Sequence, residues 1–135
     1  FVLEEGKQCD VALVGIGNPF ANSTMEETGY VNKNELEELK KHGVVGDINS
    51  FFIEADGRPS SHSINQRVIG IGLDHLKKIK KVIAIAFGQY KVDSILATLR
   101  GGYLNALITD HITAAQLIRN WELLKGQSQT AVSES

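Results

Sequence analysis

Lys91 and Asp110 are two side chains whose positions suggest a site for a small anionic ligand. Lys91 follows the glycine-containing loop 87–90 and stands in the first turn of an expected helix. Helix N-termini bind phosphate through backbone N–H groups, and cations usually favour the other end of a helix, so this lysine could add its charge to a phosphate site. Asp110 follows an apolar run and could accept a ligand hydroxyl. A solvated surface lysine and a simple helix N-cap are the structural alternatives, and the sequence leaves both open.

Asp47 and Arg67 place two further charges beside apolar stretches. Asp47 lies between Gly46 and Ile48, and it is either a turn residue or a carboxylate directed at a ligand hydroxyl. Arg67 precedes the mainly apolar residues 68–71, where an arginine binds an anion or, more commonly, forms a salt bridge.

Other kinds of chemistry lack their usual signatures. The histidines His42, His62, His75 and His111 are dispersed and Cys9 is the single cysteine, so no spacing resembles a metal site. Neither the Gly-x-Ser-x-Gly nucleophile motif nor the Gly-x-x-x-x-Gly-Lys-Ser/Thr phosphate loop is present. We therefore expect no metal, no cofactor and no internal disulfide.

Composition limits the partners of the chain. Its 135 residues, 42% of them hydrophobic, fit one globular domain. A formal net charge of −2 provides no basic face, so this segment alone is not expected to bind DNA. No apolar run reaches the roughly 20 residues needed to cross a bilayer, and a single cysteine fits a soluble, reducing compartment. The N-terminus has neither an initiator methionine nor a signal-peptide pattern, which indicates a fragment of a longer chain.

Helices and strands alternate along the sequence, and this alternation predicts a parallel sheet. Compact apolar runs predict buried strands at 11–16, 82–86 and 104–108. Apolar spacing, N-caps and glycine stops predict helices at 34–41, 73–80, 92–99 and 110–124. The expected caps are Asn34 and Asp110, and the expected stops are Gly43, Gly101 and Gly102. The inner face of the last helix is expected to carry Ala114, Leu117, Ile118, Trp121 and Leu124.

Two other segments depart from this alternation. Residues 44–48, 50–53 and 67–71 are expected to form a small antiparallel insertion, with a tight turn at 55–59. Residues 126–135 are polar and are expected to form a disordered tail. Because parallel strands end at one edge of a sheet, the loops 15–18, 87–91 and 109–111 should face a common crevice.

The motifs in this order resemble a known family. Five segments are similar to the sugar-binding effector domain of SorC-type (SorC/DeoR-like) bacterial transcription regulators. They are residues 11–17, Gly-Asp-Ile at 46–48, residues 67–71, the strand–loop–lysine segment 82–91, and Leu-Arg-Gly-Gly followed by Thr-Asp at 99–110. The resemblance extends from about Asp10 to Leu124. It implies a Rossmann-like, three-layer α/β fold related to sugar-phosphate isomerases and deaminases. Residues 1–125 would be the C-terminal portion of that domain, which is incomplete here, and the N-terminal DNA-binding domain is absent from this chain.

The same resemblance implies a function. Members bind a phosphorylated sugar from the pathway they control, and the ligand changes their oligomeric assembly and operator binding. The chain would then be a non-enzymatic effector domain in a homo-oligomeric regulator of carbohydrate metabolism, with no contact to a membrane. Arg67 and Lys91 would counter the phosphate charge, Gly88 and Gln89 would offer backbone N–H groups, and Asp47 or Asp110 would accept hydroxyls; the full expected site is Gly17, Asp47, Arg67, Gly88, Gln89, Lys91 and Asp110.

Two residues depart from the family pattern, and both are expected in the pocket. Phe87 stands where glycine is common and could narrow the phosphate loop or stack on a sugar. His111 stands where an acidic residue often follows Thr-Asp, and it would replace an acceptor with a titratable group. The main rival hypothesis is a sugar-phosphate isomerase or deaminase with Asp110 or Asp47 as general base. A generic nucleotide-binding domain ranks last, because no Gly-x-Gly-x-x-Gly motif follows a strand.

Overall fold

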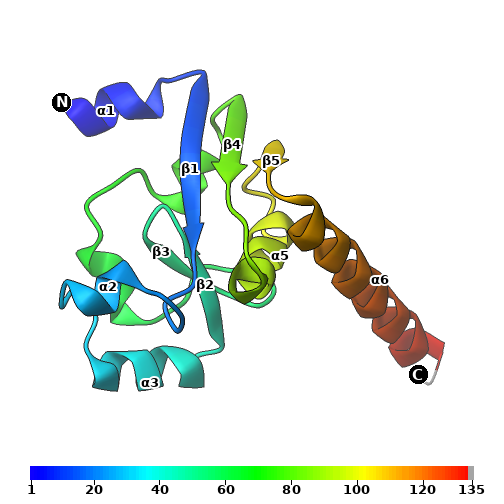
Figure 1. The fold of residues 1–135 in the computed structure, drawn as a ribbon. Helices are drawn as coiled ribbons and strands as arrows, with labels where there is room; N and C mark the ends of the chain where they lie inside the picture. The colour runs from blue at the N-terminus through cyan, green and yellow to red at the C-terminus, as the bar shows by residue number, and fades with distance from the viewer. Residues whose placement is uncertain (134–135) are drawn as a thin grey trace.

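A computed structural model describes residues 1–133 of the chain as a mixed α/β domain with one long terminal helix (Figure 1). Its elements in chain order are α1 (Val2–Lys7), β1 (Val11–Gly17), α2 (Thr24–Glu27), α3 (Lys33–Lys41), β2 (Val44–Ile48), β3 (Phe51–Glu54), the 3₁₀ turn η1 (Ser63–Arg67), α4 (Leu73–Leu76), β4 (Lys81–Ile85), the 3₁₀ turn η2 (Gln89–Lys91), α5 (Val92–Arg100), β5 (Ala106–Ile108) and α6 (His111–Ser133).

Five strands form one sheet in the order β3-β2-β1-β4-β5. Strands β1, β4 and β5 are parallel, whereas β2 pairs antiparallel with both β1 and β3. The sequence prediction of three parallel core strands is therefore confirmed, and so is an antiparallel insertion, which is the β2–β3 hairpin at one side of the sheet. Among the described residues, no helix is long and apolar enough to span a membrane.

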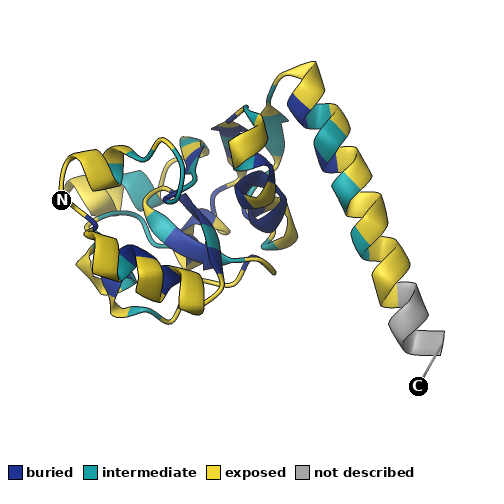
Figure 2. Ribbon diagram, turned by 60° about the horizontal axis from the view of Figure 1, so that its bottom comes forward, coloured by how far each residue is buried: buried dark blue, intermediate teal, exposed yellow. Residues whose placement is uncertain are grey.

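Helix α5 covers one face of the sheet. Its residue Ile95 is fully buried and packs in one cluster with Ala84 of β4 and Ile16 of β1. Figure 2 shows α5 as a buried element near the centre of the molecule. Three members of the predicted apolar stripe of this helix, Val92, Ile95 and Leu96, are buried, whereas the fourth, Leu99, is 42% exposed. The predicted stop at Gly101 and Gly102 is confirmed, since Gly101 is the C-cap and Gly102 has φ +73°.

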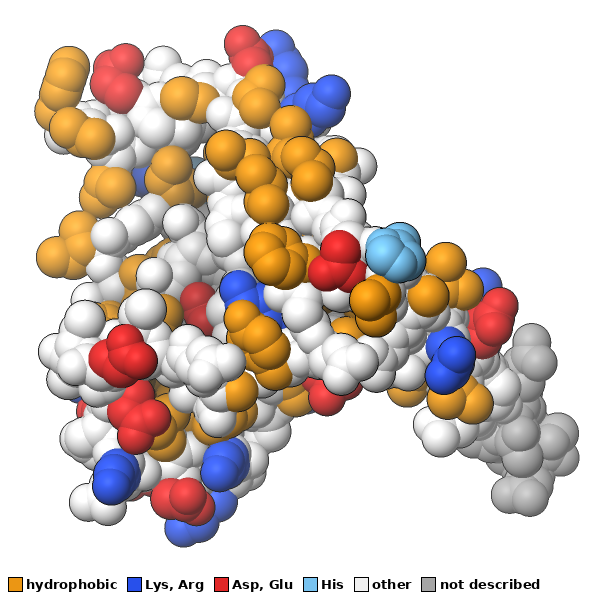
Figure 3. All heavy atoms as spheres, viewed as in Figure 1, with side chains coloured by type: hydrophobic (Ala, Val, Ile, Leu, Met, Phe, Trp, Pro, Cys, Tyr) orange, Lys and Arg blue, Asp and Glu red, His pale blue; other side chains and the backbone are white. Residues whose placement is uncertain are grey.

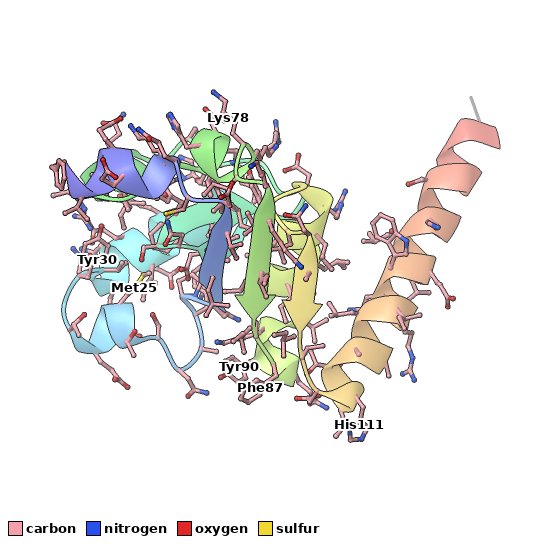
Figure 4. All side chains as sticks on the ribbon, turned by 90° about the horizontal axis from the view of Figure 1, so that it is seen from above. Met25, Tyr30, Lys78, Phe87, Tyr90 and His111 are labelled. Atoms are coloured by element: carbon pink, nitrogen blue, oxygen red, sulfur yellow. The ribbon has the colours of Figure 1, made fainter. Side chains whose placement is uncertain are left out.

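The opposite face of the parallel strands is not covered by a helix in the described part of the chain. Leu13 of β1 is 67% exposed and Ile108 of β5 is 54% exposed. In Figure 4 these strands face the viewer with no helix in front of them. The expected second helical layer is therefore absent over β1, β4 and β5 in these 133 residues, whereas α3 packs on the outer face of the β2–β3 hairpin through Phe52, opposite to the face that contacts α5 through Ile53.

The expected strand at 67–71 is also wrong. Residues 63–67 form the turn η1, and an irregular segment follows it. The side chain of Asn65 explains the difference, because its amide accepts a hydrogen bond from Phe52 N (2.8 Å) and donates one to Phe52 O (3.0 Å). Together with the backbone of residues 58–60, where Ser60 N also donates to Phe52 O (2.9 Å), this side-chain amide occupies the outer edge of β3.

The N-cap of helix α3 lies two residues before the predicted one. Asn32, not Asn34, is the N-cap, and it forms a reciprocal capping box with Glu35. The sequence contains two such pairs of asparagine and glutamate three residues apart, Asn32 with Glu35 and Asn34 with Glu37, and the structure uses the first of them. The predicted stop at Gly43 is confirmed by its φ of +74°.

Helix α6 differs most from expectation. Asp110 caps it as predicted, accepting a hydrogen bond from Thr113 N at 2.7 Å. Leu117 is buried, but Ile118 and Trp121, expected on the inner face, are 62% and 42% exposed. The helix also runs through residues 126–133, where we expected a tail without structure, because Gly126 alone does not stop it; residues 134–135 lie outside the described part.

Candidate functional site

A cavity of about 440 Å³ opens at the carboxyl end of β1. Three segments line it: the loop and first turn after β1, the turn between β2 and β3, and η2 ahead of α5. The lining residues are Gly15, Ile16, Gly17, Asn18, Ala21, Asn22, Ser23, Thr24, Met25, Asp47, Asn49, Ser50, Tyr90 and Lys91. The position agrees with the rule that parallel sheets bind ligands beyond the carboxyl ends of their strands.

The sheet register brings Gly17 and Asp47 together. Gly17 of β1 is the direct partner of Asp47 in the antiparallel pair with β2. A Cβ atom on Gly17 would collide with the Asp47 carboxylate, so glycine is the residue that leaves room for this side chain. The predicted site residues Gly17 and Asp47 therefore lie in direct contact in the cavity wall.

Asp47 is a buried carboxyl group, with 7% of its surface exposed. Burial raises its pKa to about 6, against the opposing effects of a hydrogen bond from the Ser50 backbone and the positive charge of Lys91. The β2–β3 turn makes the Ser50 contact possible, since Asn49 and Ser50 both have left-handed backbone conformations, as the central residues of a type I′ turn require.

Lys91 reaches the same cavity from the start of α5. No carboxylate among the described residues lies within ion-pairing distance of its Nζ, which sits 5.9 Å from the centre of the Tyr90 ring. The cavity thus combines one ammonium group and one carboxyl group with the hydroxyl and amide groups of its other walls.

Asn18 was not singled out from the sequence, although it joins two walls of the cavity. Its Nδ2 donates to the Tyr90 carbonyl (2.5 Å), and its Oδ1 accepts from Phe20 N (2.8 Å). A turn-forming residue directly after a strand was the available signal, but the partner is 72 residues away in the sequence and could not be identified from it. Asn49, Ser50 and Tyr90 also line the cavity and were likewise not proposed.

Arg67 lies in a neighbouring cavity with Tyr30 and Val68. Its Nη1 donates to Glu35 Oε1 (2.8 Å), its Nη2 donates to the Tyr30 carbonyl (2.8 Å), and its guanidinium lies over the Tyr30 ring. Thr24, Met25 and Ser50 form a common wall between this cavity and the first one. The salt-bridge alternative noted for Arg67 therefore describes its present contacts.

Gly88, Gln89 and Asp110 do not line the cavity. The Gly88 N–H donates to Thr113 Oγ1 (3.0 Å), and Thr113 N in turn donates to Asp110. These bonds fasten the loop after β4 to the start of α6, so Gly88 and Asp110 have local structural partners. Gln89 is exposed at the start of η2.

Phe87 and His111 were expected in the pocket, but neither lines it. Phe87 is 60% exposed, and Figure 4 shows it near Tyr90 at the end of β4, with His111 on the outside at the start of α6. Among the described residues, no group of three or more histidine, cysteine, aspartate or glutamate side chains could hold a metal ion.

The structure is thus an α/β domain with a polar cavity beyond the end of its strand β1. The Sugar-bind family of sugar-binding domains matches residues 1–119, and the chain belongs to that family. Over 119 residues it is 40% identical to the deoxyribonucleoside regulator of Bacillus subtilis, covering 88% of this chain and 38% of the relative.

Two solved structures extend the comparison. The sugar-binding domain of a transcriptional repressor from Vibrio fischeri superposes with a TM-score of 0.81 at 34% identity, covering 89% of this chain and 48% of that one. The full-length sorbitol operon regulator SorC from Klebsiella pneumoniae gives a TM-score of 0.78 at 32% identity, covering 84% of this chain and 37% of that one. The predicted resemblance to SorC-type regulators is confirmed, and the chain spans less than half the length of each of these relatives.

Proposed function

We propose that the cavity at the end of β1 binds a phosphorylated sugar that acts as the effector of a transcription regulator. The observation that carries this proposal is the pairing of one unneutralised lysine with one buried carboxyl group in a single polar cavity. An ammonium group attracts a phosphate, and a carboxylate accepts hydrogen bonds from sugar hydroxyls. Membership of a sugar-binding family supports the same ligand class.

In this proposal Lys91 binds the phosphate and Asp47 accepts sugar hydroxyls. Gly17 provides the space that Asp47 needs, and Asn18 holds the β1 loop against Tyr90. Arg67 would take part only after leaving Glu35, and Gly88, Gln89 and Asp110 would contribute by fixing the loops around the cavity. Arg67, in the neighbouring cavity, would then offer a second positive charge to another anionic group of the ligand.

The regulator as a whole would work in the cytoplasm as a homo-oligomer and bind operator DNA through a domain that is absent from these 135 residues. The named relatives are transcription regulators, which supports this assignment. The sugar-binding domain would be incomplete here and related in fold to sugar-phosphate isomerases and deaminases. Ligand binding would act by its different affinity for two states of the regulator.

One observation favours an enzyme as the second candidate. A carboxyl group with a pKa of about 6 suits a general base near neutral pH. The binding function is the stronger proposal, because no second carboxyl group and no imidazole lines the described cavity to act as the complementary acid.

The test is calorimetric titration of the chain with pentose and hexose phosphates and with the matching free sugars. We expect one sugar phosphate to bind without turnover, and Lys91→Ala to weaken it about 10- to 100-fold, the range for loss of a charge-assisted hydrogen bond. Lys78→Ala is the matched control, since Lys78 lies at the opposite end of the sheet from Tyr90 (Figure 4). Equal affinity in the Lys91 variant, or conversion of the ligand to product, would contradict the proposal.

A further inference from the structure

A second cavity of about 440 Å³ adjoins the first, between α2, the segment that follows α2 and the end of η1. Thr24, Met25 and Ser50 line both cavities, so a ligand that fills the first cavity can extend over these three residues into the second. Figure 4 shows Met25 close to Tyr30, and both residues line the second cavity. Its volume lies within the usual range for small-molecule sites, about 300–1,000 Å³.

The charge of Arg67 in this second cavity is already paired within the protein. Its Nη1 donates to Glu35 and its Nη2 donates to the Tyr30 carbonyl, both at 2.8 Å. Glu35 also forms the capping box of α3, so an anionic ligand group would have to compete with a carboxylate that the helix holds in place. Figure 3 shows acidic side chains exposed over α2, which carries Glu26 and Glu27. Their negative charge further disfavours a second anion beside Arg67.

The guanidinium group of Arg67 still offers a flat face to a ligand. Its N–H groups lie in its own plane, where they bond to Glu35 and to the Tyr30 carbonyl. One face lies over the Tyr30 ring, with Cζ 5.2 Å from the ring centre. The side chain lines the second cavity and is 46% exposed, which leaves its other face open. Planar rings stack on guanidinium groups in this way.

The remaining walls of the second cavity suit the same kind of group. Met25, Val68 and Ile69 provide apolar surface, and thioether groups pack favourably against aromatic rings. The Thr28 hydroxyl donates to the Thr24 carbonyl at 2.7 Å, so its oxygen is left as an acceptor for a polar ring substituent. Apolar walls with a few polar groups are typical of sites that bind ring systems.

We propose that the second cavity binds a planar heteroaromatic ring carried by the phosphorylated sugar that occupies the first. The ring stacks on the open face of Arg67, while Lys91 and Asp47 hold the sugar phosphate. Arg67 keeps its bonds to Glu35 and Tyr30, which a second phosphate in this cavity would break. This assignment rests on the proposed function of the first cavity and narrows the effector to sugar phosphates with an attached ring, such as a nucleoside 5′-monophosphate.

Calorimetric titration of the chain with ribose 5-phosphate and with AMP isolates the contribution of the ring, because AMP is this sugar phosphate with adenine attached. We expect AMP to bind about 5- to 150-fold more tightly, the range for stacking of one base. Arg67→Lys should remove this gain, since lysine keeps the charge without the flat face. Tyr30→Leu should reduce it, whereas Tyr30→Phe, the matched control, should preserve it. An unchanged affinity for ribose 5-phosphate shows that each variant is folded.

Met25 provides an independent readout, since it is the only methionine of the sequence and lies in the wall that the two cavities share. A chain labelled with ¹³C at the methionine methyl group gives one signal, which a ring stacked nearby shifts upfield. We expect this shift with AMP and with adenosine, but not with ribose 5-phosphate. Adenosine has no phosphate, so its effect should persist in Lys91→Ala.

Three outcomes would overturn the assignment of a ring to the second cavity. They are equal affinities for AMP and ribose 5-phosphate, a Met25 signal that AMP does not shift, and tighter binding of ribose 1,5-bisphosphate than of AMP, which would assign the cavity to a second phosphate. A different result identifies failure of the first cavity alone. If Lys91→Ala binds ribose 5-phosphate as well as the parent chain does while adenosine still shifts Met25, the phosphate assignment fails and the ring assignment stands.

Discussion

Asp47 combines burial with an ionisable group, and this combination makes the stability of the chain depend on pH. Its pKa is raised to about 6 in the folded protein, mainly by burial, whereas an unfolded aspartate titrates near 3.9. The folded state therefore binds this proton more tightly. The associated stability is fully present below pH 4 and is lost as the pH rises through about 6.

The Asp47→Asn variant tests this dependence. A difference of about two pKa units corresponds to roughly 3 kcal/mol at most, so the variant should gain up to that amount relative to the parent protein between pH 4 and pH 8. Urea unfolding at five pH values across this range measures the difference. Glu122→Gln, an exposed substitution on α6, is the control. A stability difference that stays constant with pH would show that Asp47 titrates as an ordinary carboxyl group.

The contact between β2 and α5 depends on the absence of a side chain at Gly46. A Cβ atom there would collide with the side chain of Ser94 and lie 2.9 Å from its Cα. Ser94 is fully buried, and its Oγ donates to the Val45 carbonyl at 2.8 Å, so it has little freedom to move away. The helix is thus held close to the strand that carries Asp47.

We expect Gly46→Ala to destabilise the fold by about 1–3 kcal/mol, the usual cost of overpacking a core. Thermal and urea unfolding measure this loss. Gly15→Ala is the matched control, because no atom lies within 4 Å of the added methyl group in the described structure and the backbone there is not left-handed. Equal stability of the two variants would mean that α5 moves away from β2 without cost.

The sequence predicted those elements whose signals are local. The apolar runs of β1 and β4 and the stops at Gly43 and Gly102 each depend on a local signal, and they are confirmed, as are three of the four residues of the α5 stripe. The expected strand at 67–71 is absent because the edge of β3 is already occupied by the backbone of residues 58–60 and by the Asn65 side chain, which bonds to Phe52 across 13 residues of sequence.

The distinction between local and long-range signals also applies to the candidate site. The pairing of Asp47 with Gly17 follows from the sheet register, and the Asn18–Tyr90 bond joins segments that only the parallel crossover brings together. Asp110 illustrates the opposite case, because its local alternative as an N-cap is the contact that the structure contains. Its role in ligand binding stays a prediction.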